Sequence, residues 1–172
     1  TGYTGELGYE LYVKNSFVTN LWNVLFSTNI KLNPIGLAAR DTLRLEKGYC
    51  LYGNEITDFI SPIEADLTWI TKFNKNFVGK DIIHKVYKEG RTKKLVGIEL
   101  LDKGIARKDY KIYSPTKQIE IGYVTSGTMS PSLNKPIAIG FVDIKYSDIN
   151  TIVEISVRNK KIKSKVVNLP FI

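Results

Sequence analysis

Apolar residues recur at helical spacing in three segments of the first half of the chain. The first of these segments carries them at i, i+4, i+7 and i+8, namely Phe17, Leu21, Val24 and Leu25, which predicts an amphipathic helix ending near Ser27. Strong helix formers fill residues 36–47 and precede Gly48, a residue suited to the position just after a helix. Residues 80–89 show helical register again and end at Gly90. We therefore expect three helices before residue 90.

Two further segments of this half alternate apolar and polar residues, the pattern of a half-buried strand. Residues 7–13 alternate strictly, and Glu10 falls on the face opposite the apolar residues. Three glycines spaced by three lead into this segment: Gly2, Gly5 and Gly8. They precede a predicted strand rather than a helix, and their spacing differs from that of a dinucleotide-binding loop. Residues 63–73 alternate more loosely around Trp69, and we expect a second strand there.

The pattern changes after residue 94, where six short β-rich segments follow one another. They cover residues 95–100, 110–113, 119–125, 137–142, 151–157 and 162–167. Strands of this length, separated by turn residues, are typical of a small barrel or sandwich. The chain is therefore predicted to be an α+β protein, with a domain boundary near residues 90–94 and an all-β part after it.

Composition narrows the chemistry that the 172 residues can support. A hydrophobic content of 43% argues against disorder, and a single cysteine, Cys50, excludes an internal disulfide. One histidine, His84, excludes a multi-histidine metal site, so we expect no metal. The net charge of +8 comes mainly from lysines that are spread widely and not interleaved with aromatic residues. This charge is better explained by a solvated surface than by a nucleic-acid interface.

Two arginines of the second predicted helix need partners. Arg40 and Arg44 lie one turn apart on the same face, where their positive charges repel each other unless carboxylates or a ligand anion neutralise them. Asp41 can form an ion pair with Arg44, three residues further along the helix. Arg40 has no such local partner, so it is a candidate either for a ligand or for a long-range ion pair.

The segments above, taken together, resemble the T-protein family of the glycine cleavage system, the tetrahydrofolate-dependent aminomethyltransferases. The matching segments run in family order: TGYTGE at 1–6, GYE at 8–10, GLAARDTLRLE at 36–46, LYGNE at 51–55, PIE at 62–64, GYVTSG at 122–127, SPSL at 130–133, IAIGFV at 137–142 and PF at 170–171. The resemblance thus covers almost the whole sequence.

The resemblance implies a three-lobed fold around a central folate channel. Residues 1–35 would end the first lobe, residues 36–84 would form part of a ferredoxin-like second lobe, and residues 85–172 would form a small C-terminal antiparallel β-barrel. Members of this family are about twice as long, and this chain resembles only their C-terminal half. The aspartate assigned to catalysis in the family lies in the other half. We therefore expect no catalytic residue here and no transferase activity from this stretch alone, which we interpret as a fragment of the enzyme.

The resemblance also assigns candidate binding residues. Glu10 matches the pterin-binding glutamate of the family, Tyr3 matches an aromatic residue that lines the same site, and Arg40 matches the ligand-site arginine. Arg107 and Trp69 are secondary candidates for contacts to the channel or to a partner. A carboxylate suits this role because a pterin ring presents two parallel N–H donors.

The implied reaction transfers a one-carbon unit from the aminomethyl-lipoyl group of H-protein to tetrahydrofolate, with release of ammonia. Tetrahydrofolate is the acceptor, and lipoylated H-protein is the expected partner. We expect neither nucleic acid nor membrane as a partner, and a monomer in the cytoplasm, or in the mitochondrial matrix if the source is eukaryotic.

Two alternatives stay open at this stage. One is a folate-binding paralogue, of the demethylase or the RNA-modification and iron–sulfur-assembly type, that keeps the Glu10 pocket and acts on another substrate. The other is a non-catalytic basic module that binds nucleic acid through its barrel.

Overall fold

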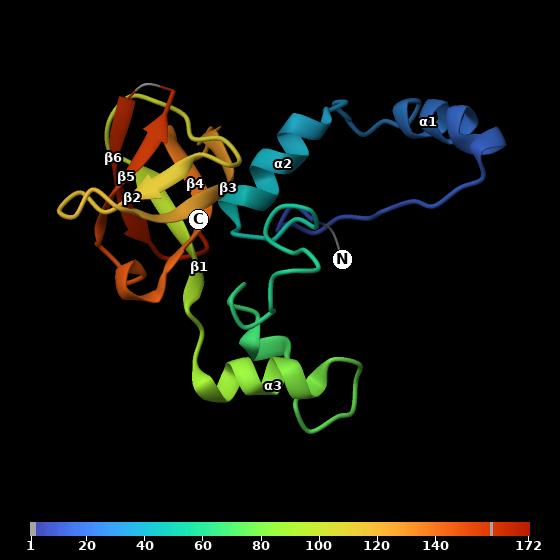
Figure 1. Cartoon of the computed structure of the whole chain (residues 1–172). Coiled ribbons are helices and arrows are strands. Elements are labelled where there is room, and N and C mark those ends of the chain that lie inside the picture. The colour runs from blue at the N-terminus through green and yellow to red at the C-terminus, as the bar shows by residue number, and fades with distance from the viewer. Residues whose placement is uncertain (1–2, 159) are drawn as a thin grey trace.

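A computed structural model describes residues 3–158 and 160–172, and it has an α+β fold in which helices precede a closed β-barrel (Figure 1). The helices are α1 (Val18–Phe26), α2 (Leu37–Glu46) and α3 (Lys80–Glu89), with short 3-10 helices η1 (Asn15–Phe17), η2 (Thr68–Ile70) and η3 (Ile144–Tyr146). The strands are β1 (Lys93–Leu100), β2 (Lys111–Tyr113), β3 (Glu120–Ser130), β4 (Lys135–Asp143), β5 (Ile152–Val157) and β6 (Lys160–Val167). All three predicted helices and all six predicted strands after residue 94 are confirmed.

The six strands close into one antiparallel barrel in the order β1-β4-β3-β2-β5-β6, with β6 pairing back to β1. Alternate residues of each strand point inward, and their apolar side chains fill the interior: Val96, Ile98, Ile112, Val124, Val153 and Ile155 are among them. A bulge in β3 between Val124 and Ser126 shifts this alternation by one residue. The Ser126 side chain consequently points away from the barrel interior and toward α2, where its hydroxyl forms hydrogen bonds with Arg44 and Glu55.

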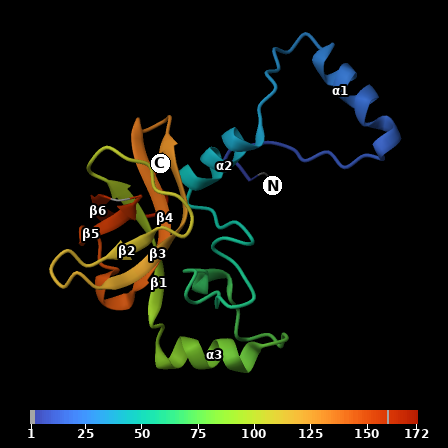
Figure 2. The same cartoon turned by 45° about the horizontal axis from the view of Figure 1, so that its top comes forward.

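A second apolar cluster attaches α2 to the outside of the barrel. Leu45 of α2 is fully buried against Leu95, Ile137, Ile139 and Phe141. The chain then turns away at Gly48, whose φ of +70° is a conformation that side chains disfavour. Near the C-terminus, the backbone N–H of Phe171 donates to the carbonyl of Glu46 over 2.9 Å. This packing fixes α2 beside the barrel, where Figures 1 and 2 both show its C-terminal end.

The strand predicted at residues 63–73 is wrong, since this segment consists of turns and η2. Asp66 has a φ of 60°, which breaks an extended conformation. The Arg91 guanidinium donates to the carbonyl of Ile63 over 2.8 Å and to the Asp66 carboxylate over 2.7 Å. Turn hydrogen bonds such as Leu67 N–H to the carbonyl of Pro62, over 2.8 Å, satisfy the backbone locally. The segment therefore forms turns that the Arg91 side chain stabilises, and it does not pair with another strand.

The strand predicted at residues 7–13 is likewise not formed. The segment is stretched out between the first turns and η1 (Figure 1), but no ladder partner for it exists within the described residues. A single extended segment has no stability of its own in water without a neighbouring strand. Its alternating apolar residues are exposed, and Leu7 and Tyr9 are almost completely so.

The division of the chain at residue 84 stays a prediction. Residues 85–89 belong to α3, and the barrel itself begins at Lys93. No helix within the described ranges is long and apolar enough to span a bilayer.

Candidate functional site

The fold brings the three primary candidate residues together from two parts of the chain, the N-terminal segment with Tyr3 and Glu10 and helix α2 with Arg40. Arg40 lies near the start of α2, and its guanidinium is 3.6 Å from the carboxylate of Glu10. The same guanidinium lies over the ring of Tyr3, with its carbon 4.7 Å from the ring centroid. The Arg40 and Glu10 side chains are each about half exposed, at 45% and 48%. The long-range ion pair left open for Arg40 is thus present, and it is open to solvent.

Tyr3 is anchored from the other side by the loop that follows α2. Its hydroxyl donates to the backbone carbonyl of Cys50, and its ring lies 6.2 Å from that of Tyr49. Burial raises the pKa of Tyr3 above its ordinary value of 10.0, so the hydroxyl stays a donor at neutral pH. The ring is therefore held in place while its face meets Arg40.

Both oxygens of the Glu10 carboxylate have partners. Arg40 approaches Oε1, and the hydroxyl of Tyr12 donates to Oε2 over 3.1 Å. This hydrogen bond, together with the negative charge of Glu10, raises the pKa of Tyr12. The carboxylate is thus positioned as an acceptor, with lone pairs still free for further donors.

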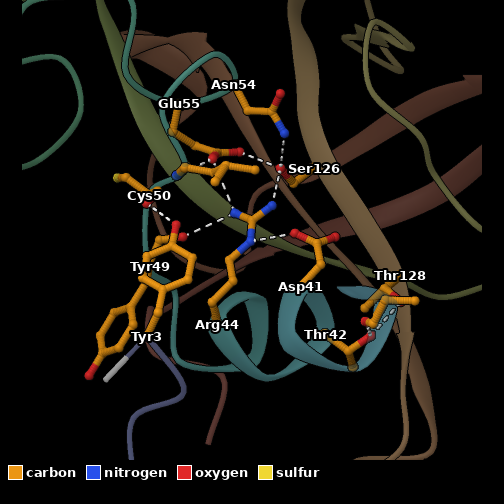
Figure 3. A network of polar contacts seen from close by, with 12 residues as sticks. Tyr3, Asp41, Thr42, Arg44, Tyr49, Cys50, Asn54, Glu55, Ser126 and Thr128 are labelled. Atoms are coloured by element: carbon orange, nitrogen blue, oxygen red, sulfur yellow. Dashed lines mark hydrogen bonds and ion pairs between the residues drawn. The ribbon is translucent and has the colours of Figure 1, made fainter. Parts of the chain in front are cut away.

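A buried arginine next to the site organises the surrounding loop (Figure 3). The Arg44 side chain is 1% exposed, and its guanidinium donates to Asp41 over 2.7 Å, to Glu55 over 3.1 Å and to Ser126 over 2.7 Å. It also donates to the backbone carbonyl of Tyr49 over 3.0 Å. The predicted pairing with Asp41 is confirmed, but it is only one of four contacts.

The carboxylate of Glu55 completes this network and is itself fully buried. It accepts hydrogen bonds from the Ser126 hydroxyl over 2.6 Å and from the backbone N–H of Leu51 over 2.9 Å. The Asn54 amide also donates to Ser126, over 3.1 Å. A buried charge is tolerated only when it is paired and hydrogen-bonded in this way. The network therefore fixes residues 49–55, the loop that holds Tyr3, against both α2 and β3.

A second buried carboxylate ties the end of α2 to the turn between β3 and β4. Glu46 accepts from the hydroxyl of Ser130, from the backbone N–H of Ser132 over 3.1 Å and from its hydroxyl over 2.9 Å. Burial alone would raise the pKa of Glu46, but these hydrogen bonds outweigh it and lower the pKa below its ordinary value of 4.5. The C-terminal end of the Arg40 helix is thus attached to the barrel.

Burial disfavours the thiolate form of Cys50. Burial raises its pKa to about 11, with the nearby carboxylate of Glu55 acting in the same direction. A thiol is a nucleophile only as the thiolate, which is scarce under these conditions.

The two secondary candidates lie elsewhere. Arg107, in the loop between β1 and β2, donates to the carbonyl of Gly127 over 3.0 Å. It lines a pocket of about 620 Å³ on the barrel, together with Lys103, Tyr110, Arg158 and Lys160 among others. Trp69 lies on η2, exposed at 72%. Within the part of the chain that the structure describes, no hydrogen bond, ion pair or ring contact joins either residue to Tyr3, Glu10 or Arg40.

Sequence reasoning missed the buried acceptors Glu46 and Glu55 and the hydroxyl of Ser126. One signal could have pointed to them, since Arg44 lies between Leu43 and Leu45 in α2. An arginine buried there requires more than one acceptor.

The arrangement suits binding of a flat, polar ligand rather than covalent chemistry. A carboxylate that can accept two donors lies beside an aromatic face and a guanidinium. The described residues hold no cluster of three or more histidine, cysteine, aspartate or glutamate side chains that could bind a metal.

Comparison with known proteins defines the family. Residues 1–75 match the GCVT N-terminal domain, and residues 93–172 match the glycine cleavage T-protein C-terminal barrel domain. The chain therefore belongs to the glycine cleavage T-protein family, and it corresponds to the C-terminal half of its members. The family predicted from the residues is confirmed.

Individual relatives agree with this assignment. The chain is 47% identical to an aminomethyltransferase of Flavobacterium psychrophilum over 99% of its own length and 48% of the relative, and 48% identical to one of Halothermothrix orenii over 100% and 48%. It also superposes on the crystal structure of the glycine cleavage system aminomethyltransferase T from Bartonella henselae with a TM-score of 0.85 and 34% identity. That match covers 91% of this chain and 44% of the other. The chain thus spans about half the length of the relatives that it matches.

Proposed function

We propose that the chain is part of an aminomethyltransferase of glycine cleavage, which transfers the one-carbon unit of an aminomethyl-lipoyl carrier to tetrahydrofolate and releases ammonia, and that the chain alone does not catalyse this transfer. Within it, Tyr3, Glu10 and Arg40 bind the folate. Membership of the T-protein family supports the reaction. The assignment of these three residues to folate binding rests on their proximity, since the Arg40 guanidinium is 3.6 Å from the Glu10 carboxylate and 4.7 Å from the ring centre of Tyr3.

The chemistry of these side chains fits the pterin ring of a folate. The ring presents an N–H and an amino group side by side, and the carboxylate of Glu10 can accept from both. Tyr3 offers an aromatic face for stacking. Arg40 places a positive charge beside Glu10, with its guanidinium 3.6 Å from the carboxylate.

The share of this chain in the reaction is orientation rather than bond making. When bound, tetrahydrofolate supplies the nitrogen atoms that accept the one-carbon unit. Tyr3 and Glu10 hold the pterin in one orientation, and the Arg44 network keeps the Tyr3 anchor rigid. Orientation of this kind removes much of the entropic barrier to a two-substrate reaction. A lipoylated H-protein is the proposed carrier partner, and the positive charge of the chain would favour an acidic one.

A tetrahydrofolate titration of the whole protein tests this proposal. Glu10→Ala removes the acceptor of two charge-assisted hydrogen bonds, each of which contributes about 1.5–3 kcal/mol. We therefore expect Kd to rise by at least about tenfold in Glu10→Ala and in Arg40→Ala. Isothermal titration calorimetry measures the change directly.

Glu6→Ala is the matched control for this titration. Glu6 lies on the same segment, is more exposed than Glu10 and pairs with Lys47 at 3.6 Å rather than with Arg40. Its Kd should equal that of the unchanged protein. If tetrahydrofolate binds equally well to all four proteins, the proposed site is wrong.

A further inference from the structure

The pocket that Arg107 lines lies on the barrel, between the loop that joins β1 to β2 and the adjoining ends of β5 and β6. Figures 1 and 2 both show this loop beside β5 and β6. Small-molecule sites commonly measure about 300–1,000 Å³, so a pocket of about 620 Å³ has room for a small organic ligand. Neither Tyr3, Glu10 nor Arg40 lines it, and it is therefore separate from the three candidate folate residues.

The fold gathers two basic stretches of the sequence around this pocket. Lys103 and Arg107 come from the loop, and Arg158 and Lys160 come from the ends of β5 and β6. All four residues are exposed, and none of the described residues that line the pocket is acidic. The Arg107 guanidinium is positioned by its hydrogen bond to the backbone carbonyl of Gly127, which leaves its charge without a counter-ion. The rim of the pocket thus carries charges of one sign.

These four cations differ from other basic residues of the barrel. Lys111 pairs with Glu120 at 2.8 Å, and Lys161 pairs with Glu154 at 3.9 Å. Within residues 3–158 and 160–172, none of the four cations of the pocket forms an ion pair with a carboxylate. Like charges around one cavity repel each other, and an anion bound between them removes this repulsion.

The floor of the pocket is apolar and belongs to the barrel core. Ile162 is exposed at only 7%, and Val157 and Tyr110 pack against the same core cluster. Ile105 adds a further apolar side chain to the lining. An apolar wall lowers the local dielectric constant, which strengthens the attraction between the cations of the rim and an anion. The floor also offers a surface for the uncharged part of a ligand.

We propose that this pocket binds a small organic anion that carries two or more phosphate or carboxylate groups on an aromatic or other apolar body. Several negative groups match the four cations, and the guanidinium groups of Arg107 and Arg158 suit either group, since each can donate two parallel hydrogen bonds. The body of the ligand covers Ile105 and Val157 and packs against the ring of Tyr110. This site does not depend on tetrahydrofolate binding.

Isothermal titration calorimetry of the whole chain with three probes tests this proposal. Metal-free ATP carries phosphates on an aromatic body, benzenetricarboxylate carries carboxylates on one, and pyrophosphate carries phosphates without a body. We expect ATP or benzenetricarboxylate to bind with a Kd below about 1 mM and at least about tenfold more tightly than pyrophosphate, because only these two cover the apolar floor.

The pattern of binding identifies the anionic groups. Binding of ATP alone assigns the pocket to phosphates, and binding of benzenetricarboxylate alone assigns it to carboxylates. If neither binds, or if pyrophosphate binds as tightly as the better of the two, the proposal is wrong.

Charge variants locate the bound probe. Arg158→Gln combined with Lys160→Gln should raise the Kd of the tighter probe at least about tenfold, because charge-assisted hydrogen bonds are lost. Lys111→Gln combined with Lys161→Gln is the matched control, since it removes the same charge from the barrel outside the pocket lining. Its Kd should stay within about twofold of the unchanged value, because salt screens charges that do not touch the ligand. An equal loss in both double variants would indicate non-specific attraction to a basic surface and contradict the proposed pocket.

The variant Glu10→Ala separates this inference from the proposed function. It should leave the Kd of the tighter probe unchanged, because Glu10 does not line the pocket. A tenfold loss of probe binding in Glu10→Ala would place the probe at the candidate folate residues and overturn the inference. The substituted residues of the pocket are exposed, so the thermal unfolding midpoint of each variant should match that of the unchanged chain.

Discussion

Replacing Glu55 with alanine should lower the free energy of unfolding by about 3 kcal/mol, near the lower end of the range for breaking a buried ion pair. The substitution leaves the charge of Arg44 buried without its fully buried partner. Asp41 still pairs with Arg44 from a half-exposed position, which limits the loss. The variant also removes the acceptor for Ser126 and for the backbone N–H of Leu51.

Urea unfolding followed by circular dichroism measures this loss. A double variant, Arg44→Met with Glu55→Leu, is the matched control because it removes both buried charges and keeps the volume filled. We expect it to recover at least half of the stability that Glu55→Ala loses, since an apolar pair can replace a buried ion pair at little cost. If the double variant is less stable than Glu55→Ala, the buried charge is not the cause of the loss.

Replacing Ser130 and Ser132 with alanine should raise the pH at which acid unfolds the chain. The pKa of Glu46 is lowered in the folded chain, so its ionised form stabilises the fold. This contribution is present above the ordinary pKa of 4.5 and is lost as the pH falls through the lowered value. Without the two hydroxyls, burial raises the pKa of Glu46, and the stabilisation is lost earlier during acidification. At neutral pH the double variant should also lose about 3 kcal/mol, because two hydrogen bonds to a charged group are removed.

Acid titration by circular dichroism between pH 7 and pH 2 measures the midpoint of unfolding. Ser147→Ala is the control, because the Ser147 hydroxyl donates to the carbonyl of Ile144 in an exposed turn and contacts no carboxylate. Its midpoint should coincide with that of the unchanged chain. If the double variant Ser130→Ala, Ser132→Ala unfolds at the same pH as the unchanged chain and the control, Glu46 does not contribute to stability as proposed.

These two carboxylates connect the fold to the candidate site. Glu46 fastens the end of α2 to the turn after β3, and Glu55 fastens the following loop to β3 through Arg44 and Ser126. Arg40 lies on that helix, and Tyr3 donates to that loop. The position of the candidate site is therefore set by buried polar contacts that lie outside it.

The barrel could be predicted from the sequence because its information is local. Each strand is a short β-rich segment bounded by turn residues, and three of the six strand pairings join consecutive strands, as between β5 and β6. Helix α3 was predictable to its last residue because Gly90 ends it. The lack of a local partner marks Arg40 as a candidate for a ligand or for a distant ion pair, and the structure shows an ion pair with Glu10.

The missed features depend on contacts between distant residues. Ser126 and Glu55 are 71 positions apart, and Ser130 and Glu46 are 84 apart. The bulge that turns Ser126 outward has no clear sequence signature. The failed strand at residues 63–73 shows the opposite error, since its loose alternation is overridden by Arg91, 28 positions after Ile63.

The most direct test of the central claim, that Glu10 and Arg40 act together in one folate site, is a double-mutant cycle for tetrahydrofolate binding by the whole protein. The cycle uses Glu10→Gln, Arg40→Met and the combination of both. If the pair acts as one unit, the double variant should bind little more weakly than the weaker single variant, with a coupling energy of about 1 kcal/mol or more. Losses that simply add, or no loss in any variant, would contradict the account.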